Sequence, residues 1–150
     1  MNLKRTIPNA LFFATVEEMI GEGRSVEMTV KGFSMRPFLR NERDVVVLSP
    51  VDGGKLREGM VLLFRHRGAH VLHRLRAIEG ERLTLEGDGN YRQSEVVARE
   101  DVVAYVSEVC LEGGRKLKYN SLGWRRRSVL SLARKWARTL VLDLKHKICK

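Results

Sequence analysis

Ser34 is the residue whose surroundings first suggest covalent chemistry. It lies in Gly32-Phe33-Ser34-Met35-Arg36-Pro37, a stretch that joins two segments typical of β-strands. A nucleophilic serine needs exposure, a base within hydrogen-bond reach and donors aimed at the developing oxyanion. Gly32 would let a substrate approach the backbone closely, Pro37 would stiffen the exit, and N–H groups around the serine could form the oxyanion hole. The alternative is an ordinary turn serine.

His73 is the histidine best placed to act as the base. It falls within the strand expected over 69–75, on the same face as Val71 and Leu75, where a histidine can also be a plain core residue. His66 lies in a basic turn and His70 points to the opposite face of that strand. A desolvated lysine can also activate a serine, and the candidates in the body are Lys4, Lys31 and Lys55.

A carboxylate that accepts a hydrogen bond from the far ring nitrogen would fix the tautomer of the histidine. Asp88 is the first candidate, in the stretch Glu86-Gly87-Asp88-Gly89-Asn90, which is also typical of a β-turn. Glu95 and Asp101 are the alternatives that follow it.

In this order, Gly-x-Ser-Met-x-Pro-x-Leu, Leu72-His73-Arg74 and Gly87-Asp88-x-Asn90 resemble the type I signal peptidases. More broadly, residues 25–110 resemble the S24/S26 serine peptidases, which share a β fold with self-cleaving repressor domains. The resemblance implies Ser34 as nucleophile, His73 as general base, as in the archaeal and endoplasmic-reticulum branch, and Asp88 as the acid. It also implies that an extended peptide binds along strand edges, with the substrate-binding residues Gly32, Phe33, Met35 and Pro37. Gln93 and Ser94 stand where the family often has further aspartates, which is why Glu95 and Asp101 stay open.

The elements that must position these residues are mostly strands. Helical spacing of apolar residues predicts a helix over 9–20, and β-branched, alternating segments separated by Gly, Asp and Asn follow from 25 to 109. We therefore expect a mainly β protein: a signal-peptidase-like β-barrel body over 25–114, an N-terminal helical segment over 1–24, and a basic amphipathic tail helix within 115–150. The length of 150 residues and the 43% apolar content suit one core.

Residues 115–150 hold 12 lysines and arginines against one acid, Asp143, so they carry a charge of +11, whereas residues 1–114 carry −1. An apolar stripe through Val129, Trp136 and Leu140 predicts an amphipathic helix. Such a helix either packs its stripe on the sheet or lies on an anionic membrane surface. Because no DNA- or RNA-reading motif accompanies the charge, we expect no nucleic-acid partner.

The sequence thus predicts a serine endopeptidase that processes a peptide or protein precursor by acyl transfer. The alternatives are a catalytically silent peptide-binding module of the same fold and a membrane-surface adaptor that acts through its tail. We expect no cofactor and no metal, since Cys110 and Cys149 lack the spacing of zinc ligands. Without a signal peptide or a spanning apolar run, we expect the protein in the cytoplasm or at the periphery of a membrane.

Overall fold

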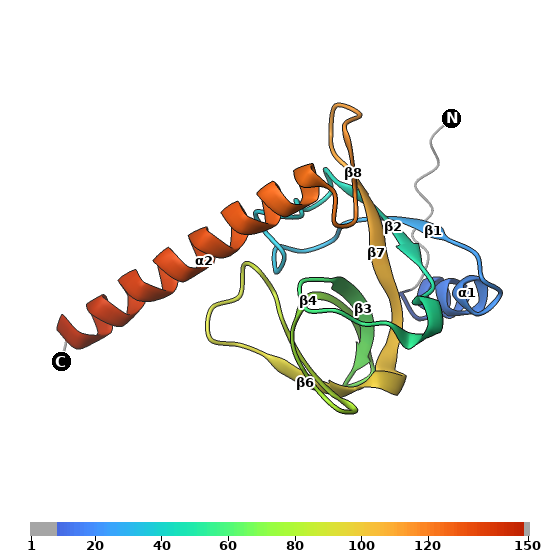
Figure 1. Cartoon of the computed structure of the whole chain (residues 1–150), viewed down its shortest axis with the longest axis horizontal. Helices are drawn as coiled ribbons and strands as arrows, with labels where there is room; N and C mark the ends of the chain where they lie inside the picture. The colour runs from blue at the N-terminus through green and yellow to red at the C-terminus, as the bar shows by residue number, and fades with distance from the viewer. Residues whose placement is uncertain (1–8, 149–150) are drawn as a thin grey trace.

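A computed structural model describes residues 9–148 and confirms a mainly β protein with one helix before the strands and one after them (Figure 1). The helices are α1 (Asn9–Gly21) and α2 (Leu122–Ile148), with short 3-10 turns η1 (Asp52–Gly54) and η2 (Arg99–Asp101). The strands are β1 (Val26–Thr29), β2 (Val45–Ser49), β3 (Val61–His66), β4 (Ala69–Glu79), β5 (Arg82–Glu86), β6 (Glu95–Ala98), β7 (Val102–Cys110) and β8 (Lys116–Lys118).

The strands form one antiparallel sheet in the order β1-β2-β7-β3-β4-β5-β6, with β8 paired to β7. The expectation of a closed barrel is wrong, because β1 and β6 end the order on opposite sides and do not pair. The sheet also has an opening beside the first half of β4, where one edge of this strand has no strand partner among the described residues. Its first residues pair with β3, whereas β5 joins it only from Arg74 onward. That opening holds the residues described below.

Two apolar clusters fill the body. The first lies under α1 and the start of α2 and includes Val16, Phe38, Leu39 and Trp124. The second lies among β3 to β6 around Leu62, Phe64, Leu75, Leu83 and Leu85. Alternating burial along β2 and β5 explains why these residues fold as strands, since every second side chain enters a cluster.

The tail differs from the alternative in which its apolar stripe packs on the sheet. β8 precedes the helix and extends the sheet into residues 116–118, and α2 then packs on the body through Trp124, Ser131 and Lys135, which follow one another at helical spacing. The stripe is exposed instead: Val129 and Trp136 keep 65% and 69% of their surface open to solvent. The interpretation in which this stripe packs on the sheet is therefore wrong.

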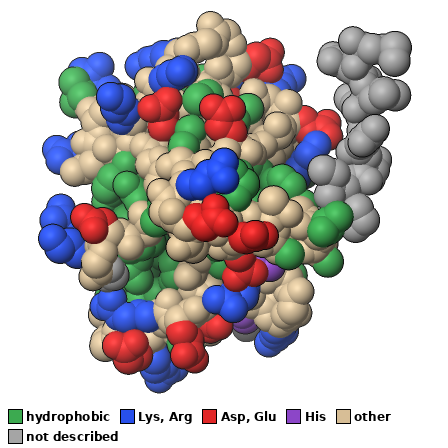
Figure 2. Space-filling model, turned by 90° about the vertical axis from the view of Figure 1, so that its right-hand side faces the viewer, with side chains coloured by type: hydrophobic (Ala, Val, Ile, Leu, Met, Phe, Trp, Pro, Cys, Tyr) green, Lys and Arg blue, Asp and Glu red, His purple; other side chains and the backbone are tan. Residues whose placement is uncertain are grey.

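Within residues 9–148, no helix combines the length and the hydropathy that crossing a bilayer would require. On the side of the molecule opposite the C-terminal end of α2, acidic and basic side chains are interspersed (Figure 2). The excess positive charge of the chain therefore belongs to the tail and not to this part of the body.

The loop between β1 and β2, which carries Ser34, is closed by a buried carboxylate. Asp44 accepts hydrogen bonds from the backbone N–H of Arg40 at 2.8 Å and from its guanidinium at 2.9 Å, while its own carbonyl accepts from the N–H of Val30. Burial by itself would raise the pKa of the Asp44 carboxyl. The hydrogen bonds from Arg40, together with the charges of Arg40 and Arg127, outweigh burial and hold the pKa below its usual range.

We predict that Asp44→Asn lowers the free energy of unfolding at neutral pH by about 2 kcal/mol or more, because it removes charge-assisted hydrogen bonds from a buried site. A carboxyl whose pKa is depressed on folding adds stability above its unfolded pKa and loses it as the pH falls toward the folded value. The difference between wild type and variant should therefore shrink below about pH 4. Urea unfolding at pH 7 and pH 3 measures it, and a difference that does not change with pH would contradict the prediction.

Candidate active site

Ser34 lies half-buried in the loop between β1 and β2, in the wall of a small surface cavity. The cavity has a volume of about 160 Å³ and is lined by Val30, Lys31, Gly32, Ser34, Met35, His70, Val71 and Leu72. Phe38 and Leu39 anchor the loop in the first apolar cluster, and Arg127 of α2 donates to the carbonyls of Pro37 and Phe38 at 3.2 and 2.7 Å. The serine is thus held by core packing on one side and by a helix on the other.

His73 is buried on β4, and its partner is Glu95. Nδ1 of the ring lies 2.9 Å from a carboxylate oxygen of Glu95, the first residue of β6. The Glu95 side chain is itself mostly buried, at 17% exposure. Because the carboxylate takes Nδ1, the other ring nitrogen is the one available as a base. Of the three acids considered from the sequence, Glu95 is the one placed to orient this histidine.

Gly87 lies where the His73 ring and the Ser34 backbone meet. A Cβ on Gly87 would collide with the carbonyl oxygen of Ser34 and come within 3.0 Å of both Nε2 of His73 and Nδ2 of Asn90. The N–H of Gly89 donates to that same carbonyl of Ser34 at 2.7 Å. The glycine turn therefore allows the backbone of Ser34, the free nitrogen of His73 and the Asn90 amide to share one small space.

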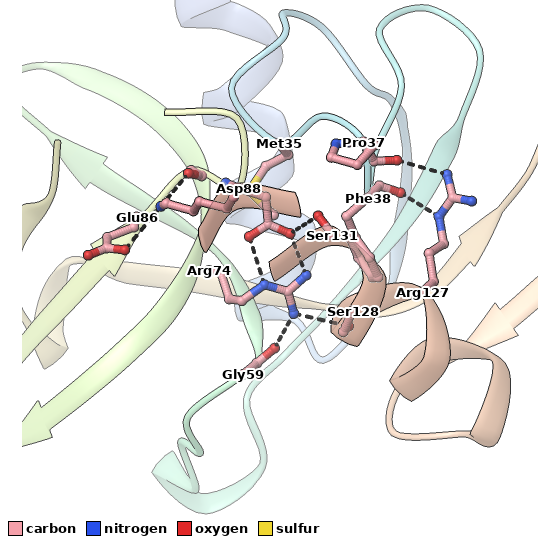
Figure 3. Close-up of polar contacts among 12 residues, drawn as sticks. Met35, Pro37, Phe38, Gly59, Arg74, Glu86, Asp88, Arg127, Ser128 and Ser131 are labelled. Carbon is pink, nitrogen blue, oxygen red and sulfur yellow. Dashed lines mark hydrogen bonds and ion pairs between the residues drawn. The ribbon is translucent and has the colours of Figure 1, made fainter. Parts of the chain in front are cut away.

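Asp88 does not orient His73, and this part of the expected triad is corrected. Its carboxylate receives two hydrogen bonds from Arg74, at 2.8 and 2.7 Å, and a third from Ser131 at 2.8 Å (Figure 3). Both side chains of the ion pair are 1% exposed. Arg74 also donates to the Gly59 carbonyl at 3.0 Å and lies over the ring of Phe38. Asp88 is thus the centre of a buried polar network.

The inner face of α2 supports the turn that contains Asp88. Lys135 donates to the carbonyl of Gly87 at 2.9 Å and pairs with Glu86 at 3.0 Å, one helical turn beyond Ser131. Sequence reasoning missed both α2 residues because it followed the apolar stripe. Their positions could have found them, because Ser131 and Lys135 follow Trp124 at helical spacing on the face opposite the apolar stripe.

Beside Ser34, one edge of β4 is open to an extended peptide. The hairpin from β3 turns at Arg67 and Gly68, whose φ values of 50° and 76° are those of a type I′ turn. In that register Val71 and His73 exchange hydrogen bonds with β3, so the N–H and C=O groups of His70 and Leu72 face the other edge. Among the described residues, no strand pairs with β4 before Arg74 on that edge.

The other expected residues fall into clear positions. Met35 is buried, with its sulfur beside the N–H of Asp88, and Phe33 is 60% exposed next to the serine. The N–H of Gly32 donates to the side chain of Asn41, and Pro37 is half-buried. Met35 thus lines the cavity beside Ser34, whereas Phe33 lies at the surface.

Two of the alternative bases have other partners, and Lys4 lies outside the described residues. Lys31 pairs with Glu42 at 3.1 Å, and His70 contacts Glu17 at 3.1 Å and stacks on Phe13. No group of three or more metal-ligating side chains occurs among the residues that the structure describes.

Comparison of the chain with models of known protein families finds no match, and a search of curated proteins finds no similar sequence. The resemblance to S24/S26 peptidases thus stays a prediction from the motifs, and the geometry at Ser34, His73 and Glu95 is the basis for inferring a function.

We predict that Gly87→Ala disrupts the site, because a methyl group there would meet the Ser34 carbonyl and the His73 ring. The expected result is a variant destabilised by about 1–3 kcal/mol whose His73 ring signals shift in NMR spectra. Gly21→Ala is the matched control, since nothing lies within 4 Å of a Cβ at that position. Unchanged His73 resonances in Gly87→Ala would contradict the close approach.

We predict that neutralising Asp88 and neutralising Glu95 affect different properties of the protein. Asp88→Asn should lower the free energy of unfolding by about 3–5 kcal/mol, because it leaves Arg74 buried without its counter-charge. Glu95→Gln should cost much less stability, since the glutamine amide can still hydrogen-bond Nδ1 of His73, but should change the tautomer balance of His73. Urea unfolding and histidine ¹⁵N shifts measure the two effects. Equal losses of stability would refute the separation of structural and orienting roles.

Proposed function

We propose that the protein is a serine endopeptidase that cleaves an extended peptide by acyl transfer through Ser34. The observation that carries the proposal is the arrangement around His73: Glu95 holds Nδ1, while Nε2 lies beside Gly87 and the Ser34 backbone. A carboxylate, an imidazole and a serine in this order are the parts that nucleophilic acyl transfer requires. This arrangement and the order of the motifs along the chain both support the proposal.

In the proposed reaction, Nε2 of His73 takes the hydroxyl proton as Oγ of Ser34 attacks the peptide carbonyl. The tetrahedral oxyanion would be stabilised by N–H groups of the serine loop, with the Asn90 amide as a side-chain donor on the same side. His73 then gives its proton to the leaving amine. Water, deprotonated by the same nitrogen, releases the acid product and restores Ser34. Glu95 stabilises the charged imidazole during both steps.

The substrate class is an extended peptide that adds to the open edge of β4. The main-chain groups of His70 and Leu72 would pair with the peptide, and the cavity beside Ser34 would take one side chain. At about 160 Å³ the cavity favours a small residue there. Phe33, exposed beside the serine, would contact the peptide from the loop side.

One observation favours a second candidate, a peptide-binding module without turnover. Among residues 9–148 the hydroxyl of Ser34 forms no hydrogen bond, with His73 or with any other group, although catalytic hydrogen bonds often tighten only when substrate binds. In this alternative the open strand edge is the functional part and Ser34 is a turn residue.

We predict that the wild-type chain cleaves members of a mixed peptide library and that Ser34→Ala and His73→Gln lower the rate by about 10⁴-fold or more. Mass spectrometry of the products measures both the cleavage and its position. Ser25→Ala and His146→Gln, which change an exposed serine and an exposed histidine outside the site, are the comparison variants and should cleave as the wild type does.

Activity should also be lower at acid than at neutral pH, because a histidine base must be neutral to accept the Ser34 proton. A rise confined to alkaline pH would favour a lysine such as Lys31 instead. Equal cleavage by wild type and Ser34→Ala would refute the proposal. Peptide binding without turnover in both would establish the second candidate.

A further inference from the structure

The outer face of α2 is an apolar surface that the body does not cover. The exposed side chains follow one another at helical spacing along the side opposite Ser131 and Lys135, from 46% exposure at Leu140 to 79% at Ile148. They include Val129, Leu130, Trp136, Leu140, Leu144 and Ile148. Monomeric proteins rarely expose a continuous apolar strip of this kind unless it binds something.

The charge around this face is positive and uncompensated. Six exposed bases of α2 form no ion pair with any residue that the structure describes: Arg125, Arg126, Arg134, Arg138, Lys145 and Lys147. The one acid of the helix, Asp143, pairs with Arg92 of the body. Three of the bases also edge a hollow of about 450 Å³ with an apolar floor, lined by Arg134, Ala137, Arg138, Val141, Leu142 and Lys145.

We propose that α2 docks on an anionic membrane surface, with its outer face in the boundary between headgroups and acyl chains. Leucine, valine and tryptophan opposite lysine and arginine is the pattern of helices that lie in this boundary, and unpaired bases complement anionic headgroups. A nucleic acid would match the charge but would leave the leucines in water. A second copy would match the apolar strip but would bring two sets of unpaired bases together.

This docking goes beyond peptide cleavage and does not depend on it. The inner face of α2 holds the helix to the body through Trp124, Ser131 and Lys135, so the outer face is free to enter a bilayer without unfolding the protein. In Figure 1 the C-terminal half of α2 extends past the strands, which gives a flat surface room to approach it.

Vesicle co-sedimentation of the full chain tests the proposal. The wild type should sediment with vesicles that contain equal parts of phosphatidylcholine and phosphatidylglycerol, bind vesicles of phosphatidylcholine alone far more weakly, and dissociate as salt is raised. Arg134→Gln with Arg138→Gln should weaken binding about 25-fold, at about 1 kcal/mol for each base. Leu140→Ser with Leu144→Ser should weaken it about a hundredfold, because the apolar contact is lost.

The matched controls are Arg43→Gln and Leu11→Ser, an exposed base and an exposed leucine of the body, which should bind as the wild type does. Ser34→Ala should also bind normally. A measurement on the wild-type chain does not depend on how the variants fold: its tryptophan emission should shift to shorter wavelength when anionic vesicles are added. Trp136→Phe should abolish this shift.

Three results would overturn the proposal. The first is no sedimentation with anionic vesicles, and the second is equal loss of binding in the body controls and the α2 variants. The third is concentration-dependent dimerisation, or binding of an oligonucleotide, that the leucine substitutions abolish while vesicle binding is absent.

Discussion

The ion pair between Arg74 and Asp88 is the constraint on which the site depends. Both side chains are 1% exposed. Burying such charges costs several kcal/mol of folding free energy unless they pair with each other and their remaining hydrogen-bonding positions are filled. Gly59, Ser128 and Ser131 fill them here. The pair thereby joins β4, the glycine turn and α2, and none of these can move without leaving a buried charge unpaired. The turn beside Ser34 is fixed for that reason.

Much of the sheet could be predicted because burial leaves a local trace. β-branched residues and period-two alternation marked residues 25–109 as strands, nearly the same residues over which β1 to β7 lie, and apolar spacing marked α1. Lys116-Leu117-Lys118 carried no such trace, since two of its three residues are charged, and β8 was missed. Closure into a barrel could not be predicted either, because alternation shows which face of a strand is buried but not which strands pair.

The site was predictable where order along the chain sufficed. Ser34 and His73 could be selected by residue type and strand position, but the acid could not, because its role depends on which face of β4 it meets. His73 and Arg74 are neighbours, so they point to opposite faces. Asp88 reaches the Arg74 face and Glu95 the His73 face. A turn motif in the sequence does not show how far its carboxylate reaches or which way it points. Asp88 was therefore assigned to His73, although its partner is Arg74.

The orientation of α2 connects these features physically. An amphipathic helix on a protein usually turns its apolar side inward, but beyond Trp124 this one meets the body with serines, an arginine and a lysine. Directional polar contacts fix both the rotation and the axial position of a helix, whereas apolar packing tolerates sliding. Lys135 can support Gly87 only if that rotation is kept. The apolar side then has to face outward. The geometry that steadies the serine loop therefore also leaves an exposed apolar surface on the opposite side of the same helix.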